Sequence, residues 1–485
     1  MFDKILHQLT YHREEPMLFN TGIFLYLFLV LLFFYQFVYK KENARILYLT
    51  LFSLFFYYKS GGLFFLLLIL STVIDYTIAN FIYKSKSKPT KTAWLVLSLV
   101  INLGFLAYFK YTNFLLGIVT DLQLGHFKPM DIVLPVGISF YTFQVLSNTI
   151  DVYRGLLKPA KNIFDFGFYI SFFPHLVAGP IVRASAFLPQ IHTDIKITKE
   201  DRAVAVFLIV TGLFKKAVIS DYISVNFVDR VFDAPTLYTG FENLMAVYGY
   251  AMQIYCDFSG YSDMAIGVAL LLGYRLGINF MQPYQSSNIT EFWRRWHISL
   301  SSWLRDYLYI PLGGNKKGKV RQYVNLMITM LLGGLWHGAS WNFIFWGLLH
   351  GVALAIDKMF RKIVTIPQTV LMKTLGVIFT FHFVCFCWIF FRAPDFQTAG
   401  DILSRIFNHF EGEIFIQWMK GYAFVFALIL FGYFTHFIPE RMNKKSELIL
   451  SRAPIIAQSL LIVVVIWMVI QVKSSEIQPF IYFQF

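Results

Sequence analysis

Two histidines stand out in an otherwise largely apolar chain. His297 lies among indoles and arginines in EFWRRWHISLSSWLRDYLYIPLGGNKKGKVR, residues 291–321, and His337 lies in LLGGLWHGASW, residues 331–341. A bilayer disfavours ionisable side chains, by about 2.5–3.5 kcal/mol for a central charge, so those kept in apolar runs are candidates for function. A neutral imidazole accepts a proton near neutral pH without burying a charge. The chemistry that these residues suggest is general-base catalysis.

His337 also has a structural alternative. A histidine between Trp336 and Gly338, one turn after Gly333 and Gly334, suits a hydrogen bond across a close helix interface. The local sequence favours neither interpretation. Two other histidines in apolar runs, His175 and His350, are interpreted as structural.

The stretch around His297 predicts one amphipathic helix. Apolar and aromatic residues recur at helical spacing from Trp293 to Leu308, with arginines and serines on the other faces. Asn288 or Thr290 would cap this helix, and Pro311 would end it. The pattern alone favours a plain anchor at the membrane–water boundary. The functional alternative is a cytoplasmic mouth that receives an anionic substrate, with the arginines and His297 lining it.

A third polar cluster lies in QIYCDFSGYSDMAIG, residues 253–267. Asp257 and Asp263 are carboxylates in an apolar run, and they could orient a histidine or pair with an arginine such as Arg275. We interpret them as a structural network between helices. No set of His, Cys and carboxylate residues has the spacing of metal ligands, so we expect no metal site.

The elements that carry these residues must be membrane helices. The chain has 485 residues, of which 57% are hydrophobic and 14% charged, which predicts an all-α polytopic membrane protein. Its apolar runs suggest about ten to twelve passes, with re-entrant or interfacial pieces. The net charge of +14 gathers in short basic loops, as the positive-inside rule describes, so nucleic-acid binding is not expected.

Two runs are predicted to turn back within the membrane. Residues 46–58 and 63–83 lie between basic loops and would form a hairpin turned at Lys59–Gly62. Residues 322–357 would span ~54 Å as one helix, against a ~30 Å hydrocarbon core, so we expect a hairpin or re-entrant bend broken within residues 331–341. We find no linker, and we expect residues 1–485 to form one membrane domain.

The longer motifs resemble one known family. The chain is similar to membrane-bound O-acyltransferases, and more narrowly to the bacterial alginate and peptidoglycan O-acetyltransferase branch. The matching motifs lie mainly between residues 130 and 351. They are LPVGISFYTFQ (134–144), FFPHLVAGPIVR (172–183), FKKAVISD (214–221), QIYCDFSGYSDMAIG (253–267), FWRRWHISLSSWLRDYLYIPLGGN (292–315), LLGGLWHGASWNFIFWGLLHG (331–351) and the ending PFIYFQF (479–485).

The resemblance implies a fold, a reaction and site residues. The fold would be a ring of about ten to twelve tilted helices around a thinned centre, in a bacterial inner membrane. His337 matches the family's membrane-embedded catalytic histidine, and His297 matches its second histidine. The residues expected to bind substrate are Trp293, Arg294, Arg295, Trp296, Arg305, Asp257 and Trp336.

The same resemblance implies the substrates and partners. The donor would be a cytosolic acyl thioester, most simply acetyl-CoA, used as a substrate and not as a bound cofactor. The acetyl group would pass to a hydroxyl of a polysaccharide, directly or through a periplasmic SGNH-type O-acetyltransferase with a catalytic serine. Membrane lipid would surround the protein.

Two alternatives differ in testable ways. One is D-alanyl transfer from a carrier protein to a cell-envelope polymer, which binding to a phosphopantetheinyl carrier would favour. The other is a transporter of a small anion or lipid, which would show uptake without thioester cleavage. Transporters commonly carry inverted repeats, and we find none in this sequence.

Overall fold

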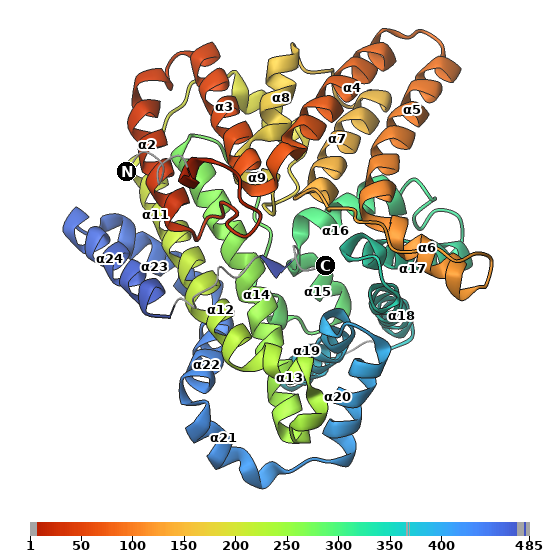
Figure 1. Cartoon of the computed structure of the whole chain (residues 1–485), viewed down its shortest axis with the longest axis vertical. Coiled ribbons are helices and arrows are strands. Elements are labelled where there is room, and N and C mark those ends of the chain that lie inside the picture. Colours follow the sequence, from red (N-terminus) through yellow and green to blue (C-terminus); the bar gives the residue numbers. More distant parts are fainter. Residues whose placement is uncertain (1–6, 365–366, 368, 473–479, 482–485) are drawn as a thin grey trace. The chain divides into compact units, whose positions relative to one another are not determined.

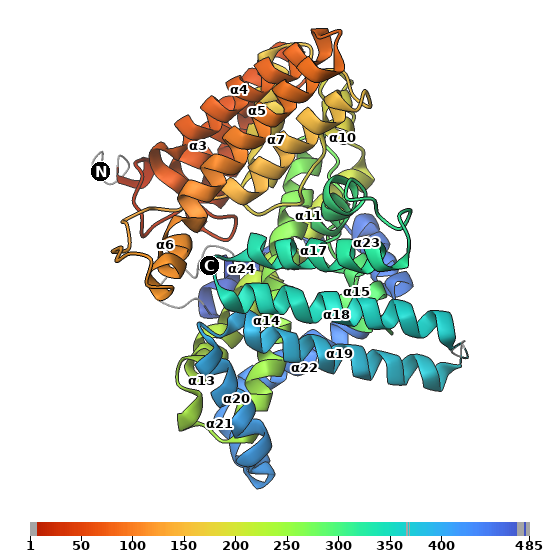
Figure 2. The same ribbon diagram turned by 90° about the vertical axis from the view of Figure 1, so that its right-hand side faces the viewer.

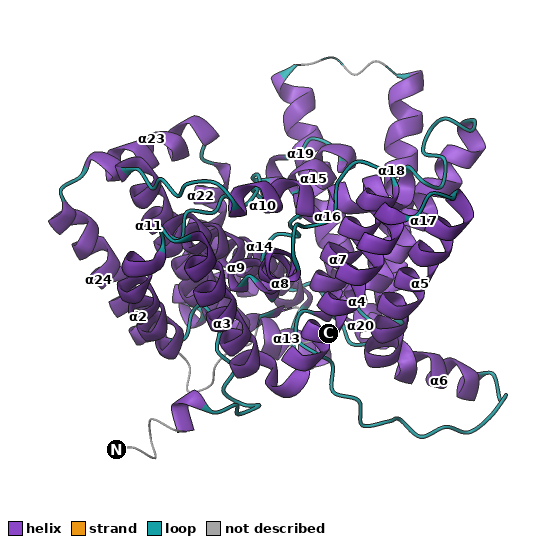
Figure 3. Cartoon of the chain, turned by 90° about the horizontal axis from the view of Figure 1, so that it is seen from above, coloured by secondary structure: helices purple, strands orange, loops and turns teal. Residues whose placement is uncertain are grey.

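The chain is entirely helical where its structure is described. The computed structural model describes residues 7–364, 367, 369–472 and 480–481, and Figure 3 shows helices and loops with no strand in this part of the chain. This confirms the expected all-α class. The chain divides into two compact units, one of Met1–Ala205 with Ala265–Gly277 and one of Val206–Met264 with Ile278–Phe485. A single domain over residues 1–485 stays a prediction.

The first unit carries the N-terminal helices. They are α2 (Gly22–Val38), α3 (Glu42–Gly61), α4 (Phe65–Lys84), α5 (Lys88–Leu106), α6 (Thr112–Asp121), α7 (Ile138–Tyr153), α8 (Ile163–Ser171), α9 (Phe173–Leu176) and α10 (Ala184–Ile191). Two further helices, α11 (Lys199–Leu213) and α14 (Gly240–Leu271), contribute residues to both units. The N-terminal ends of α2, α5 and α8 are capped by the side chains of Thr21, Ser87 and Asn162.

The second unit carries the remaining helices. They are α12 (Asp221–Ile223), α13 (Asp229–Asp233), α15 (Ile289–Arg295), α16 (Ile298–Leu304), α17 (Lys319–His337), α18 (Trp341–Ile363), α19 (Val370–Arg392), α20 (Phe396–Asn408), α21 (Phe415–Gly421), α22 (Ala423–Phe437), α23 (Glu440–Arg452) and α24 (Ile455–Val472). Wider π-helical turns at Phe214–Ser220 and Arg305–Tyr309 extend α11 and α16.

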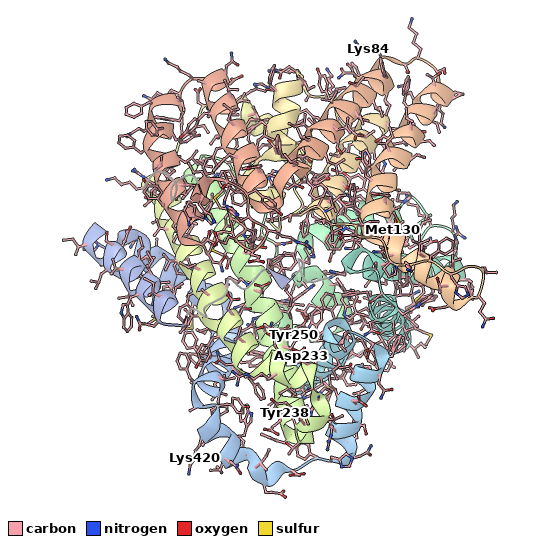
Figure 4. All side chains as sticks on the ribbon, viewed as in Figure 1. Lys84, Met130, Asp233, Tyr238, Tyr250 and Lys420 are labelled. Atoms are coloured by element: carbon pink, nitrogen blue, oxygen red, sulfur yellow. The ribbon has the colours of Figure 1, made fainter. Side chains whose placement is uncertain are left out.

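Helices α3 and α4 form the turn that the sequence predicts. Helix α3 ends at Gly61, and Gly62 takes a left-handed φ of +63°, which glycine adopts without steric cost. A single turn then leads into α4, and the two helices diverge from it as a V (Figure 1). Lys84 lies at the far end of α4 from this turn (Figure 4). The chain therefore bends at the predicted place, and a hairpin that crosses the membrane twice stays a prediction.

A buried carboxylate ties three helices of the first unit together. Asp75 on α4 is fully buried and accepts hydrogen bonds from Ser98 Oγ at 2.5 Å, Asn102 Nδ2 at 2.7 Å and Thr149 Oγ1 at 3.3 Å. These donors lie on α5 and α7. Because a buried polar group is costly unless it is hydrogen-bonded, this network fixes how α4, α5 and α7 pack.

Among the described helices, fewer are long and apolar enough to cross a membrane than the ten to twelve passes predicted. In the described chain, five segments are long and apolar enough to cross a membrane. The helices Gly412–Gly421 and Ala423–Phe437 are bent by 101° relative to each other, and they add a sixth span if the pair counts as one. The five are Glu42–Lys84, Lys88–Asp121, Lys199–Asp233, Trp341–Ile363 and Val370–Arg392. The protein is thus a multi-pass membrane protein.

Helices α17 and α18 form the second predicted hairpin. Helix α17 ends at His337, Gly338 to Ser340 form the break, and α18 begins at Trp341. Figure 2 shows α17, α18 and α19 running side by side. The run of residues 322–357 therefore turns within the predicted segment 331–341, and it places His337 at the turn.

The stretch around His297 differs from its prediction. Asn288 caps α15 by accepting a hydrogen bond from the Glu291 N–H at 2.9 Å, as expected. The single amphipathic helix is wrong, because the helix stops at Arg295 and restarts at Ile298. His297 stands at this break with a left-handed φ of +43°. The spacing of Trp293 and Trp296 from Leu300 therefore does not describe one helix face.

Candidate active site

The α17–α18 hairpin holds His337 through close glycine contacts. A Cβ atom at Gly334 would lie 2.2 Å from the Phe343 carbonyl oxygen, and one at Gly347 would lie 2.4 Å from the Met330 carbonyl oxygen. Only glycine allows the two backbones to approach so closely. His337, one turn after Gly334, is consequently carried against α18 and is 3% exposed.

Aromatic rings surround the His337 imidazole. The ring of Trp346, on α18, lies 5.0 Å from it and nearly perpendicular, at 82°. The ring of Phe391, on α19, lies 5.2 Å away at 72°. The neighbouring Trp336 ring is 5.0 Å away. Such walls exclude water and strengthen any electrostatic interaction made inside them. The imidazole of His337 is thus enclosed by three aromatic rings, and its catalytic role stays a prediction.

His297 has an unusual backbone conformation, and hydrogen bonds from the two residues after it to Asn279 hold it in place. The Ile298 N–H donates to the Asn279 carbonyl at 2.9 Å, and Ser299 Oγ donates to Asn279 Oδ1 at 2.8 Å. These bonds fix the break between α15 and α16. A histidine with positive φ is uncommon, and such backbone conformations persist where the surroundings enforce them, often at functional sites. The side chain of His297 is fully buried.

Trp336 brings the two histidines into one site. Its ring lies 5.9 Å from the His297 ring and 5.0 Å from the His337 ring. The two histidines stand far apart in sequence, but both contact the same indole. The His297 ring also packs on Phe258 of α14, at 4.5 Å and 74°. The predicted pair is therefore assembled in one place, together with the predicted Trp336.

Trp293 and Trp296 each pack against other aromatic rings, and of the two only Trp296 is buried. Trp296 is 1% exposed and packs 5.0 Å from the Trp388 ring. Trp293 donates its Nε1–H to His350 Nδ1 at 3.3 Å and packs on Trp346. Trp296 therefore does not lie at a water-facing surface as an anchor helix would require, whereas Trp293 is partly exposed. Trp346 packs on both Trp293 and His337, so it links Trp293 to the His337 site.

The three arginines lie away from these aromatic rings. Arg294 is exposed. Arg295 pairs with Glu291 at 2.7 Å, and Arg305 pairs with Asp306 at 2.6 Å with a side chain that is 62% exposed. Arg295 is more enclosed, with a side chain that is 27% exposed. Their predicted role in binding substrate stays a prediction.

The two carboxylates on α14 pair with lysines. Asp257 binds Lys216 at 2.6 Å, and Asp263 binds Lys215 at 2.7 Å. The suggested pairing with Arg275 is wrong, because Arg275 pairs with Asp201 at 2.6 Å. Neither carboxylate forms a described hydrogen bond to a histidine. The interpretation of this cluster as a network between helices is the one that these contacts support.

Several residues of the site were missed from the sequence. Phe391 and Trp346 lie in apolar runs that suggested ordinary spans, and Phe258 lies beside the carboxylate that drew attention. Nothing in their spacing distinguishes them from other buried aromatics. Lys216 carried a signal, because it is a lysine in the apolar run 203–223.

The described residues contain no group of three or more His, Cys, Asp or Glu side chains arranged to hold a metal ion. The three cysteines, Cys256, Cys385 and Cys387, are free and buried.

The buried state of His297 predicts a pH dependence of stability. Residues 278–318 lie outside the candidate spans, and burial lowers the pKa of His297 to about 3. In the unfolded chain this pKa is about 6.5, so the unfolded state takes up the proton first as pH falls. Stability from this residue is present above pH ~6.5 and is lost as pH falls from there toward ~3.

We therefore expect the free energy of unfolding to drop by about 2 kcal/mol more in the natural protein than in His297→Gln between pH 7 and pH 5. Thermal melts of both proteins in one detergent across this range measure the difference. Parallel curves would show that His297 is not held neutral.

The described chain is that of a multi-pass membrane protein with two buried histidines that contact one indole. The chain belongs to the membrane-bound O-acyltransferase family. The profile of that family matches residues 156–393, which include both histidines. The protein is accordingly an O-acyltransferase, and this favours the enzyme over the transporter alternative.

The chain is similar over much of its length to several named members of the family. It is 38% identical to the peptidoglycan O-acetyltransferase of Helicobacter pylori, over 81% of this chain and 80% of that protein. It is 35% identical to the probable alginate O-acetylase of Pseudomonas putida, over 97% of this chain and all of that protein. The teichoic acid D-alanyltransferase of Bacillus subtilis is 32% identical over 56% of this chain and 72% of its own length.

Proposed function

We propose that the protein transfers an acetyl group from a cytosolic thioester across a bacterial inner membrane to a hydroxyl of a cell-surface or extracellular polysaccharide. The observation that carries the proposal is the buried imidazole of His337 at the turn of the α17–α18 hairpin, enclosed by Trp336, Trp346 and Phe391. The relatives named for peptidoglycan and alginate acetylation support the acetyl group and the polysaccharide acceptor.

In this mechanism His337 acts as the general base. The acceptor oxygen attacks the thioester carbonyl carbon while the His337 imidazole takes the hydroxyl proton. The carbon–sulfur bond then breaks, and the imidazolium returns the proton to the leaving thiolate. Base catalysis of this kind contributes about 10²–10⁴-fold. His297, across Trp336, would serve as the second site residue on the donor side.

The donor would approach over the basic surface near α15 and α16. Arg294, Arg295 and Arg305 are exposed or half-exposed, and their charge would attract the phosphates of acetyl-CoA. A ring of ten to twelve tilted helices would let this donor side meet an acceptor side at His337. The acetyl group would pass to the polymer directly or through a periplasmic SGNH-type O-acetyltransferase.

The test is thiol release from acetyl-CoA by purified protein in nanodiscs, with and without an alginate or peptidoglycan oligosaccharide. We expect release that depends on His337 and increases with the acceptor. Absence of release from folded protein would contradict acetyl-CoA as the sufficient donor.

D-alanyl transfer remains the second candidate, because the Bacillus subtilis relative carries that activity in its name. It predicts that a D-alanyl-loaded phosphopantetheinyl carrier protein supports transfer where acetyl-CoA does not. Presenting both donors to the same preparation separates the two functions.

A further inference from the structure

A buried ion cluster lies between α14 and the π-helical turn that follows α11. Lys216 Nζ lies 2.6 Å from Asp257 Oδ1 and 2.7 Å from Asp221 Oδ1. The side chains of Lys216 and Asp257 are 4% and 3% exposed. Desolvating such charges is expensive, and replacing them by apolar residues is often no less stable. Simple packing therefore does not require this cluster.

Local geometry explains how the lysine reaches α14. A Cβ at Gly212 would lie 2.5 Å from the Gly260 carbonyl oxygen, and one at Gly260 would lie 2.7 Å from the Gly212 carbonyl oxygen. The two helices thus cross in backbone contact. The π-helical turn Phe214–Ser220 begins just after this crossing, and both Lys215 and Lys216 reach carboxylates on α14. Such turns occur frequently at functional sites.

The second oxygen of Asp257 binds a distant part of the chain. Asp257 Oδ2 accepts a hydrogen bond from the Ile481 backbone N–H at 2.9 Å. The preceding residue, Phe480, is fully buried and packs on Phe258 at 5.3 Å and on Tyr261 at 5.2 Å. These two residues are the described part of the PFIYFQF ending, whose residues 479 and 482–485 lie outside the described chain.

The bound segment lies next to the histidine site. Phe258 contacts Phe480 on one side and the His297 ring, at 4.5 Å, on the other. Lys216 pairs with one carboxylate oxygen of Asp257, and the other oxygen accepts the Ile481 N–H. The Asp257 carboxylate therefore connects the ion cluster to the segment that packs on Phe258. A carboxylate that accepts a backbone N–H forms a charge-assisted bond, roughly twice as strong as a neutral one.

We propose that Lys216 and Asp257 are positioning residues that hold the Phe480–Ile481 segment against the Phe258 wall of the His297 site, and that acyl transfer depends on this placement. The claim that acyl transfer depends on this placement rests on the proposed function, and the claim about the placement itself does not. The neighbouring pair Lys215–Asp263 has the same chemistry between the same helices, but no described hydrogen bond joins it to Phe480 or Ile481. It supplies a matched control.

Thiol labelling tests the placement without using activity. The Ile481→Cys variant, at a position 3% exposed, is treated with N-ethylmaleimide in nanodiscs. The three natural cysteines are buried, and each background is also measured without Ile481→Cys. Adding Asp257→Ala should increase the labelling rate at least about ten-fold, because the N–H loses its charged acceptor. Asp263→Ala should leave the rate within two-fold, and Asp257→Asn, which keeps an acceptor oxygen, should preserve most of the protection.

The labelling results judge the first half of the proposal. A thiol that stays protected in Asp257→Ala, or that is exposed equally in Asp263→Ala, would overturn it. This holds even if the natural protein transfers no acyl group, so the failure of the proposed function is recognised separately.

Turnover, measured without Ile481→Cys, judges the second half. We expect Asp257→Ala to lower kcat at least about ten-fold with little change in KM for the thioester, and Asp257→Asn to restore most of it. Faster labelling with unchanged kcat would overturn the dependence of transfer on this segment.

Discussion

Replacing His337 by alanine should lower acyl transfer by about 10²-fold or more, while the protein still folds. The imidazole is the only titratable group that we assign as base, and removing such a base typically costs about 10²–10⁴-fold. The loss should appear in kcat, because the group acts on the reacting proton and not on donor binding. Transfer of radiolabelled acetyl to an oligosaccharide, with protein in nanodiscs, measures it.

Two variants make the result interpretable. His337→Gln keeps much of the side-chain volume between Trp346 and Phe391, so its loss of activity cannot be ascribed to a cavity. His382→Ala removes an exposed histidine on α19 and should leave the rate unchanged. A His337→Gln protein with near-natural turnover and an unchanged melting temperature would remove His337 from the mechanism.

Replacing Gly334 by alanine should destabilise the α17–α18 hairpin and abolish transfer together. The new Cβ would lie 2.2 Å from the Phe343 carbonyl oxygen, which is backbone and cannot rotate away. The helices must separate, and His337 one turn later moves with α17. We expect a loss of about 3 kcal/mol or more, at the upper end for overpacking, seen as a lower melting temperature.

Gly104→Ala provides the control for this substitution. Gly104 is also helical, on α5, and a Cβ there meets no atom within 4 Å. It should leave the melting temperature and turnover unchanged, or raise stability slightly through helix propensity. If Gly334→Ala behaves like Gly104→Ala, the close approach of α17 and α18 does not position His337.

Much of the helical organisation could be predicted from the sequence. Apolar length, charged flanks, glycine and capping chemistry predict the helical class, the bend at Gly62, the break after His337 and the cap at Asn288. The prediction was wrong for residues 291–310, where one helix was expected and two are found. The pairing of Ile298 and Ser299 with Asn279 decides that break, and no local propensity reveals such a partner.

By itself, the sequence determined that this is a helical membrane protein, that its resemblance is to acyltransferases, and that His297 and His337 are the residues to examine. These conclusions depend on composition, on unusual residues in apolar runs and on motifs, all of which are local properties. Only the tertiary structure decided that Trp336 contacts both histidines, that Trp293 and Trp296 pack on other indoles, and that Asp257 holds Ile481. Such contacts join residues far apart in the chain, and they arise from how glycine-lined helices pack, which the spacing along one helix does not encode.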